Sequence, residues 1–383
     1  MITGALQDPS LFRLLLVISV ALAFAVYTRF HLVGGGSVTG GYVAILIVTS
    51  QWSTLLGTAL ATGLTVSLMR GVVLRLLGLP RSWQFMLSVL SGALITATLA
   101  AIIPPWIDLG DPFALAITFG AFVVPGLVSY DVSHQGLPKT LLALSMVAGA
   151  TLALCVPMFL LLSLLPTAVP PSSAIVEGIP QDLMPYAIIA TIVVGAVLRF
   201  TLGLRSGGFI GALFLVEFFT VPAFLAVGAA ALTTHGLVWL LDRRIVLTLR
   251  QRAMIALMVG SLVAWAGLYW GSALGWLPAQ EADLFVLSPL LATGLIAADM
   301  GREGSDALRT LLGTGLACVV IAGLLWLGEE HGLAWAALAL LAVATGVIPG
   351  ALSLREAWAA AERSGRERLV ASGRDRGPST AAS

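Results

Sequence analysis

The polar side chains best suited to chemistry stand close together in one run of an otherwise apolar sequence. Asp131, His134 and Gln135 are three and four positions apart, and Lys139, the only lysine, follows them. If the run is helical, residues three and four apart share a face, so the carboxylate could pair with the imidazole or the amide. Two interpretations stay open: a functional polar lining or docking surface, or a solvated helix end beside Gly136.

The same run returns in the second half of the chain. GLVSYDVSHQG, which begins at Gly126, aligns without gaps with GLIAADMGREG, which begins at Gly294, at a shift of 168 residues. A shift of 167 carries GSVTGGY onto GLRSGGF. The paired candidates are Asp131 with Asp299, His134 with Arg302, Gln135 with Glu303, Gly40 and Gly41 with Gly207 and Gly208, Gly92 with Gly260, and, after a small gap, Arg29 with Arg199. Several blocks in register predict a tandem duplication.

Four further charged residues are candidates because of their apolar surroundings. Arg29 and Arg199 each follow the first predicted helix of a unit, and Arg205 lies in the second glycine-rich loop. Each arginine either snorkels to the lipid headgroups or contacts an anion from a cavity. Glu217 stands alone between apolar residues. A carboxylate inside the membrane is a functional hypothesis, whereas one at a helix end is ordinary.

The sequence carries no recognisable motif for self-contained catalysis. GxxxxGK[ST], HExxH and GxSxG are all absent, so we expect no catalytic residue and no nucleotide cofactor in this chain. Cys155 and Cys318 lie in apolar segments without metal-ligand spacing, which predicts small buried side chains and no metal site. A formal net charge of +1 gives no global field that would favour a nucleic-acid partner.

The elements that must position these residues are predicted to be membrane-spanning helices. Hydrophobic residues make up 58% of the chain and charged residues 10%, against about a quarter in soluble domains. Apolar runs approach or exceed the roughly 20 residues that a helix needs to cross a bilayer. A membrane β-barrel would instead show strands of alternating polarity. The composition therefore predicts an all-α, multi-pass membrane helical bundle.

Glycine and proline divide some apolar runs into pieces too short to cross. From Gly41 to Leu77, 37 helical residues would span about 55 Å. We therefore expect breaks at Ser50-Gln51 and at Glu217 to Pro222, and a third interruption at Pro125-Gly126. Each unit is then about four crossing helices with short broken or re-entrant segments, whose free backbone groups must be buried or line a wet cavity. Close helix packing is the alternative explanation for the glycines.

The predicted domains follow from the repeat. They are a first membrane repeat at 1–165, a proline-rich linker at 166–183, a diverged second repeat at 184–328, an extra helix at 329–354 and a charged, partly disordered tail at 355–383. Orientation stays open at this stage. Nine crossings would place the basic hairpin ends and the arginine-rich tail on opposite sides, although both favour the cytoplasm.

The run from Phe122 to Leu142, FVVPGLVSYDVSHQGLPKTLL, resembles the PgsC/CapC family, the small membrane subunit of bacterial poly-gamma-glutamate synthases. The VPGL segment with Pro125, the QGLP that follows it and the upstream GGY segment carry the resemblance, which covers about residues 10 to 165. In the second unit REGSD stands where HQGLP stands in the first. Because family members are typically one unit long, the chain resembles a fused double form.

This resemblance implies a membrane partner for a Mur-ligase-like, ATP-dependent amide ligase and for an extracytoplasmic accessory subunit. Together these subunits would make and export an anionic glutamate polymer through the lipid bilayer. The first alternative is a stand-alone secondary transporter of a small solute, indicated by the repeats, the broken helices and Glu217. A membrane-embedded transferase is the second, and it would need a general base. His134 is the candidate, but its mate Arg302 could not serve.

Overall fold

The computed structural model describes residues 9–73, 81–103, 114–163, 179, 183–216, 221–273, 288–300 and 304–345. Every element in these ranges is a helix. The first repeat contains α2 (Pro9–Phe30), α3 (Thr39–Val48), α4 (Trp52–Leu68) with the π-helical η1 (Met69–Val73), α6 (Arg81–Ile102), α7 (Ala114–Gln135) and α8 (Leu137–Ser163). The second contains α9 (Met184–Thr201), α10 (Gly208–Val216), α11 (Val221–Arg244), α12 (Leu249–Ala273), α14 (Ser288–Asp299) and α15 (Gly304–His331). A short apolar helix, Leu333–Thr345, follows.

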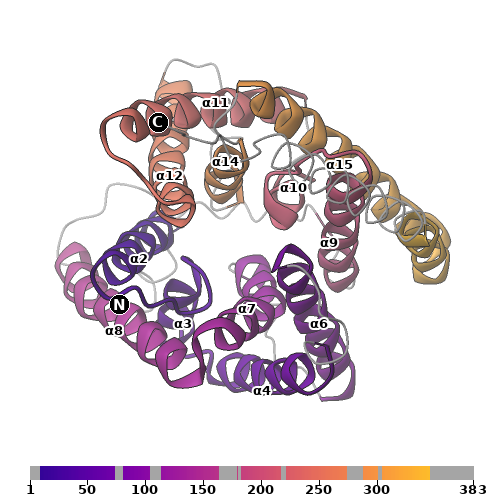
Figure 1. The fold of residues 1–383 in the computed structure, drawn as a ribbon, viewed down its shortest axis with the longest axis horizontal. Coiled ribbons are helices and arrows are strands. Elements are labelled where there is room, and N and C mark those ends of the chain that lie inside the picture. Colours follow the sequence, from indigo (N-terminus) through magenta and orange to yellow (C-terminus); the bar gives the residue numbers. More distant parts are fainter. Residues whose placement is uncertain are drawn as a thin grey trace, which may run out of the picture.

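Two lobes, one for each repeat, lie side by side (Figure 1). Equivalent helices make equivalent contacts within the lobes, since α6 packs on α7 as α12 packs on α14, and α3 packs on α8 as α10 packs on α15. Between the lobes, α2 packs on α12 and α6 packs on α9. Each repeat thus presents its first helix to the same element of the other. This reciprocal pattern is that of two similar units related by a pseudo-two-fold axis.

The interface between the lobes combines a continuous apolar core with aromatic contacts at its two helix crossings, α6 with α9 and α2 with α12. One hydrophobic cluster includes buried residues from both repeats. Trp83 on α6 stacks on Phe200 of α9, with 4.2 Å between ring centroids. At the equivalent crossing, the guanidinium carbon of Arg250 on α12 lies 5.6 Å from the ring centroid of Tyr27 on α2.

Six of the described helices are long and apolar enough to cross a membrane. The helix α4 shows how such a segment divides its surface between lipid and protein. Leu56, Leu60 and Leu64 form an exposed stripe, whereas Thr58 and Thr65 on the other side are buried. The two threonine hydroxyls donate to the carbonyls four residues earlier, at Thr54 and Ala61, so no hydroxyl faces the apolar surroundings unpaired.

In the first repeat, the break predicted at Ser50-Gln51 is present between the half-helix α3 and the full-length helix α4. The half-helix α3 has 10 residues, about 15 Å, and its middle residues Ala44, Ile45 and Leu46 are almost completely buried. Ser50 has a positive φ of 59°, which ends α3 before α4 begins at Trp52. In the second repeat α10 has 9 residues, and the break predicted from residue 217 lies outside the described residues up to 220.

The interruption predicted at Pro125-Gly126 is wrong, because α7 continues through both residues. A proline removes the N–H that would bond to the carbonyl four residues earlier. Here that carbonyl is on Ala121, and the hydroxyl of Thr96 on α6 donates to it at 3.3 Å. A neighbouring helix therefore satisfies the group that the proline frees, as membrane helices require.

Glycines allow the closest helix crossings, and they do so at equivalent places in the two lobes. A Cβ added at Gly92 would stand 2.5 Å from the backbone nitrogen of Gly126, and one added at Gly260 would stand 2.6 Å from the Cα of Gly294. In α3, a Cβ at Gly41 would stand 2.5 Å from the Oγ of Ser19. The paired glycines of the sequence are thus explained by backbone packing.

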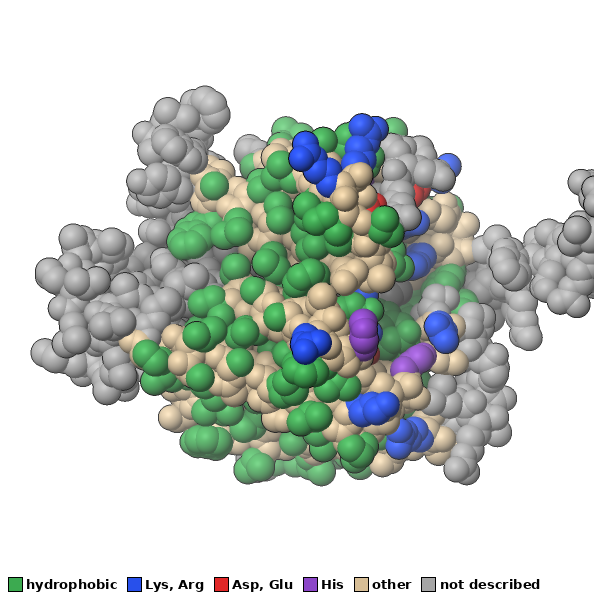
Figure 2. Space-filling model, turned by 60° about the vertical axis from the view of Figure 1, so that its left-hand side comes forward, with side chains coloured by type: hydrophobic (Ala, Val, Ile, Leu, Met, Phe, Trp, Pro, Cys, Tyr) green, Lys and Arg blue, Asp and Glu red, His purple; other side chains and the backbone are tan. Residues whose placement is uncertain are grey.

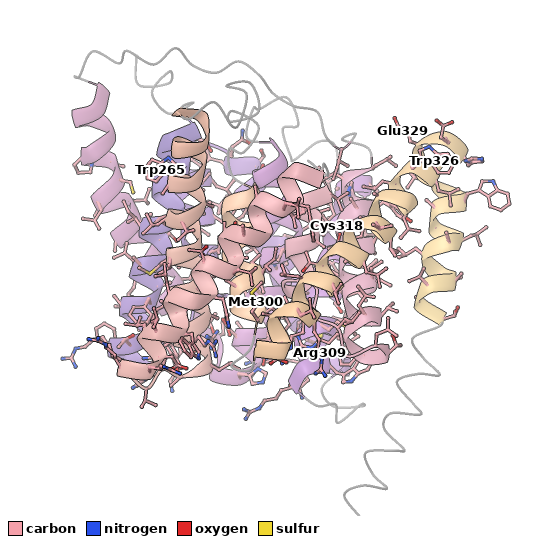
Figure 3. The ribbon with its side chains drawn as sticks, turned by 90° about the horizontal axis from the view of Figure 1, so that it is seen from above. Trp265, Met300, Arg309, Cys318, Trp326 and Glu329 are labelled. Atoms are coloured by element: carbon pink, nitrogen blue, oxygen red, sulfur yellow. The ribbon has the colours of Figure 1, made fainter. Side chains whose placement is uncertain are left out.

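Most basic residues of the described helices lie at one face of the bundle. Arg309 marks this face in Figure 3, and Trp265, Trp326 and Glu329 mark the opposite one. Figure 2 shows the basic and histidine side chains in the centre and right of that view, with hydrophobic side chains covering the left. By the positive-inside rule, an excess of arginine is expected on the cytoplasmic side of a membrane bundle.

The direction of α4 resolves the conflict over orientation. Arg70, at the end of α4, donates to the carbonyl of Val132 near the end of α7, and Arg250 links that end to α2 through Tyr27. The carboxyl ends of α2, α4 and α7 therefore meet at the same face. Because α2 and α4 run in the same direction, the half-helix α3 between them carries the chain back from this face. The helix of residues 333–345 turns at Gly332 back toward the basic face (Figure 3). The repeats are parallel to each other.

Candidate functional site

The first glycine-rich loop, residues 31–38, connects α2 to α3 at the basic face. Gly35 and Gly36 have φ angles of +79° and +85°, a region that residues with a Cβ rarely adopt. Successive backbone N–H groups that converge on one point form a small anion-binding concavity. Both N–H groups donate to Oδ2 of Asp131 on α7, at 2.9 and 3.1 Å. The loop is therefore held by a carboxylate from 95 residues later in the chain.

Asp131 also joins the two repeats. Its Oδ1 lies 3.1 Å from Nη2 of Arg250, at the start of α12 in the second lobe. The Asp131 side chain is 5% exposed, whereas that of Arg250 is 38% exposed, so the pair lies at the rim of the bundle. Two backbone donors and one guanidinium give the buried carboxylate charge-assisted partners on both oxygens. We call Asp131, Arg250, Gly35 and Gly36 the cross-repeat latch.

Gln135 holds the start of the same loop, one helical turn after Asp131. Its Oε1 accepts from the N–H of Val33 at 3.3 Å, and its Nε2 donates to the carbonyl of Val33. The Nε2 also donates to Oγ1 of Thr140 on α8 at 3.1 Å. Thr39 donates its hydroxyl to the carbonyl of Gly35. The shared face predicted for Asp131 and Gln135 is thus used to fix a loop of the backbone.

His134 points away from this loop and is exposed. Its Nδ1 lies 2.8 Å from the carbonyl oxygen of Tyr130, which can only accept, so this nitrogen carries the proton. The pairing of Asp131 with His134 that the spacing allowed is replaced by the ion pair with Arg250. Gly136, with a φ of +90°, ends α7 and lets α8 begin at the next residue.

The second glycine-rich loop is held in a different way. Arg205, within the loop, donates from Nη1 to the backbone carbonyl of Asp299 at 2.8 Å, and its Nη2 lies 3.7 Å from Oδ2 of Asp306. Leu202 stands where Gly35 stands in the first loop, and its φ of −103° has the opposite sign to that of Gly35. Gly207 has a positive φ of +69°, and a Cβ there would also stand 2.5 Å from Cγ1 of Ile296, so both the backbone and the packing favour glycine.

The remaining predicted site residues are divided between the basic face, the helix interfaces and undescribed segments. Arg29 and Arg199 are exposed at the carboxyl ends of α2 and α9. Gly40, Gly41, Gly126 and Gly294 lie at close helix contacts, and Gly208 begins α10. Glu217, Arg302 and Glu303 lie outside the described residues.

Sequence reasoning missed the role of Arg250, which it treated as one of several basic hairpin ends. The shift of 168 that aligns the motifs does not pair Arg250 with another arginine, because the residue 168 positions earlier is Ser82. One signal was present, since a carboxylate predicted to be near an apolar core needs a cation or several donors.

A small crevice lies behind the first loop, between α2, α3, α8 and α12. Leu32, Gly34, Ala143 and Met254 are among the residues that line it. Its volume of about 10 Å³ for the centre of a water molecule is near the minimum that holds one water. The crevice is thus far too small for a polymer strand or a sugar, and it serves only as a gap between packed backbones.

The residues of this site fix the first glycine-rich loop and join the two lobes. Within the described ranges, no group of three or more histidine, cysteine, aspartate or glutamate residues could hold a metal ion. The latch instead combines a fixed loop, a buried carboxylate and a partly exposed guanidinium at the junction of two lobes.

Comparison with known proteins agrees with this two-lobed architecture. The model of the family named Capsule biosynthesis CapC matches twice, over residues 18–141 and 190–311. The first match runs from within α2 into α8, and the second runs from within α9 into α15. No curated protein and no solved structure matches the chain. The chain therefore belongs to the capsule biosynthesis CapC family and carries the family unit twice, as two lobes of one helical membrane bundle.

Proposed function

We propose that this chain is the integral membrane subunit of a complex in the plasma membrane that makes and exports poly-gamma-glutamate, an anionic polyamide. In this role it anchors a Mur-ligase-like, ATP-dependent ligase at the cytoplasmic face. It works with an extracytoplasmic accessory subunit and helps the polymer to cross the bilayer. The observation that carries the proposal is the double match to a capsule biosynthesis family on a multi-pass helical bundle.

The charge distribution supports the part of the proposal that concerns an anionic product. Arg29 and Arg199 are exposed at equivalent ends of α2 and α9, on the basic face, which the positive-inside rule favours as the cytoplasmic one. A face lined by one sign of charge raises the local concentration of ions of the opposite sign. A chain of glutamate carboxylates would therefore be attracted to both lobes. ATP-dependent ligation is assigned to another subunit because this sequence lacks a phosphate-binding motif.

The proposal is tested by measuring polymer at the cell surface. Deletion of the gene should abolish surface polymer, and the double variant Arg29→Ala/Arg199→Ala should reduce it several-fold, while the purified ligase keeps its activity. Arg309→Ala is the matched control, since Arg309 is also exposed on the basic face but lies outside the duplicated pair. Normal polymer output after deletion would contradict the proposal.

The half-helices α3 and α10 favour one second candidate, a secondary transporter of a small solute. Discontinuous helices in repeated units are typical of transporters, where they surround the substrate site. Purified protein in liposomes should then take up a solute, and Glu217→Gln should abolish uptake. Loss of surface polymer without any uptake activity would favour the synthase subunit.

A further inference from the structure

The loop between α11 and α12 presents apolar side chains on the basic face. Val246 is 94% exposed and Leu249 is 84% exposed, the two largest values among the exposed hydrophobic residues of the described chain. Arg243 and Arg244 precede the loop, and Arg250 follows it. We call residues 243–250 the apolar tip. Contiguous exposed apolar groups with a polar rim mark interaction sites more often than single exposed residues do.

The backbone of the apolar tip is fixed. Leu247 is buried, and its N–H donates to Oδ1 of Asp242 at 3.3 Å. Thr248 and Gln251 form a reciprocal cap at the start of α12, because Oε1 of Gln251 accepts from the N–H of Thr248 at 3.0 Å and Oγ1 of Thr248 accepts from the N–H of Gln251 at 3.3 Å. Val246 and Leu249 are therefore displayed by a rigid loop, which lowers the entropy cost of binding through them.

Its position places the apolar tip outside the hydrocarbon of the bilayer. The guanidinium carbon of Arg243 lies 3.7 Å from the ring centroid of Trp239, one turn earlier on α11. Tryptophan and arginine together are typical of the headgroup level. Val246 is seven residues beyond Trp239, past the end of α11 at Arg244. Lipid tails are thus a poor explanation for its exposure, whereas a protein partner in the cytoplasm would cover it.

The first repeat carries a similar pattern in its sequence. Arg75 and Arg81 flank the run LLGLP, just as Arg244 and Arg250 flank IVLTL. Residues 74 to 80 lie outside the described part of the chain. An apolar run between arginines at the same hairpin of both units indicates a function that the duplication has kept.

We propose that the apolar tip is the docking surface for the cytoplasmic ligase subunit, which would offer an apolar pocket rimmed by acidic side chains. This inference rests on the proposed function and specifies where the partner binds. The charge of the rim selects an acidic partner, since the tip has three arginines, of which Arg250 pairs with Asp131 within the described part of the chain. Apolar contacts at the centre provide the affinity.

The test measures binding of the purified ligase of the same capsule system to the full-length chain in nanodiscs of neutral lipid. The variant Val246→Ser/Leu249→Ser should weaken binding by about tenfold or more, since buried apolar anchors dominate interface energies. Leu333→Ser is the control: Leu333 is also exposed but lies by the Gly332 turn, on the face opposite the tip. Both variants should keep the elution volume and the melting temperature of the parent protein.

Three other outcomes would overturn the inference, and they separate it from the proposed function. Unchanged binding by Val246→Ser/Leu249→Ser would show that the ligase docks elsewhere, with the proposed function intact. A photo-crosslinking residue at position 246 that captures lipid and no ligase in the assembled complex would assign the tip to the membrane. Failure of the parent chain to bind the ligase at all would refute the proposed function as well.

Discussion

The two glycine-rich loops occupy equivalent places in the two lobes, but opposite groups hold them. In the first repeat, a carboxylate on α7 accepts from the N–H groups of Gly35 and Gly36. In the second, a guanidinium on the loop itself, that of Arg205, donates to a carbonyl at the end of α14. The first loop is thus held through its backbone N–H groups, and the second is held through the arginine side chain that it carries. The shared fold therefore needs a fixed loop, and the duplication has allowed two chemical ways of fixing it.

The difference also shows where the two lobes have become specialised. Asp131 has a partner in the other lobe, Arg250, whereas Arg205 bonds within its own lobe to Asp299 and Asp306. The first loop is thereby coupled to the interface between the repeats, and the second is not coupled in this way by its arginine. The substitutions below separate the two arrangements, beginning with the largest expected effect.

Asp131→Ala should cause the largest loss of stability. It leaves the N–H groups of Gly35 and Gly36 and the guanidinium of Arg250 without their carboxylate, and each buried unsatisfied donor costs about 1–3 kcal/mol. We expect a loss of roughly 2–4 kcal/mol in the free energy of unfolding, since Arg250 is partly hydrated. Asp299→Ala should cost less, because the contact with Arg205 uses the backbone carbonyl, which alanine keeps. Thermal unfolding in nanodiscs measures both, and equal losses would contradict the comparison.

Gly35→Ala should come next. A Cβ at this position would stand 2.5 Å from Cγ2 of Val128, and the φ of +79° is strained for alanine. Strained backbone of this kind costs about 1–3 kcal/mol. Leu202→Ala is the matched substitution in the second loop, where φ is −103° and the side chain is 60% exposed, and it should change stability by less than about 0.5 kcal/mol. A larger loss at Leu202 than at Gly35 would show that the first loop is not the constrained one.

Much of this architecture could be predicted from the sequence, because apolar length and repeated glycines act locally. The helical bundle, the duplication and the short helix before Ser50 followed from run lengths and from aligned blocks. The continuity of α7 could not be predicted, because it depends on Thr96, whose hydroxyl reaches the carbonyl of Ala121 from a different helix. The proline alone predicts a break in the helix. The break is absent because the neighbouring Thr96 donates to the carbonyl that the proline leaves without a donor.

The candidate site was predicted in part for the same reason. The spacing of Asp131 and Gln135 placed both on one face of α7, and both in fact hold the first loop. Their partners are not readable from spacing, since Arg250 is 119 residues away and lies in the other repeat. The shift of 168 was misleading here, because it pairs Arg250 with Ser82, whereas Arg81 stands one position away. Interactions that break the symmetry of a duplication are those that self-alignment cannot find.

Arg250→Gln tests the link between the lobes alone, and its effect should be smaller than those of Asp131→Ala and Gly35→Ala. The carboxylate of Asp131 keeps both glycine N–H donors, and the arginine side chain is 38% exposed, so we expect a loss of about 0.5–1 kcal/mol that shrinks further at high salt. In a double-mutant cycle, Asp131→Ala and Arg250→Gln should be coupled, whereas Asp131→Ala and Arg205→Gln should be additive because the two pairs share no partner. Coupling between Asp131 and Arg205 as strong as that between Asp131 and Arg250 would show that the two loops stabilise each other, and that the latch is not confined to one of them.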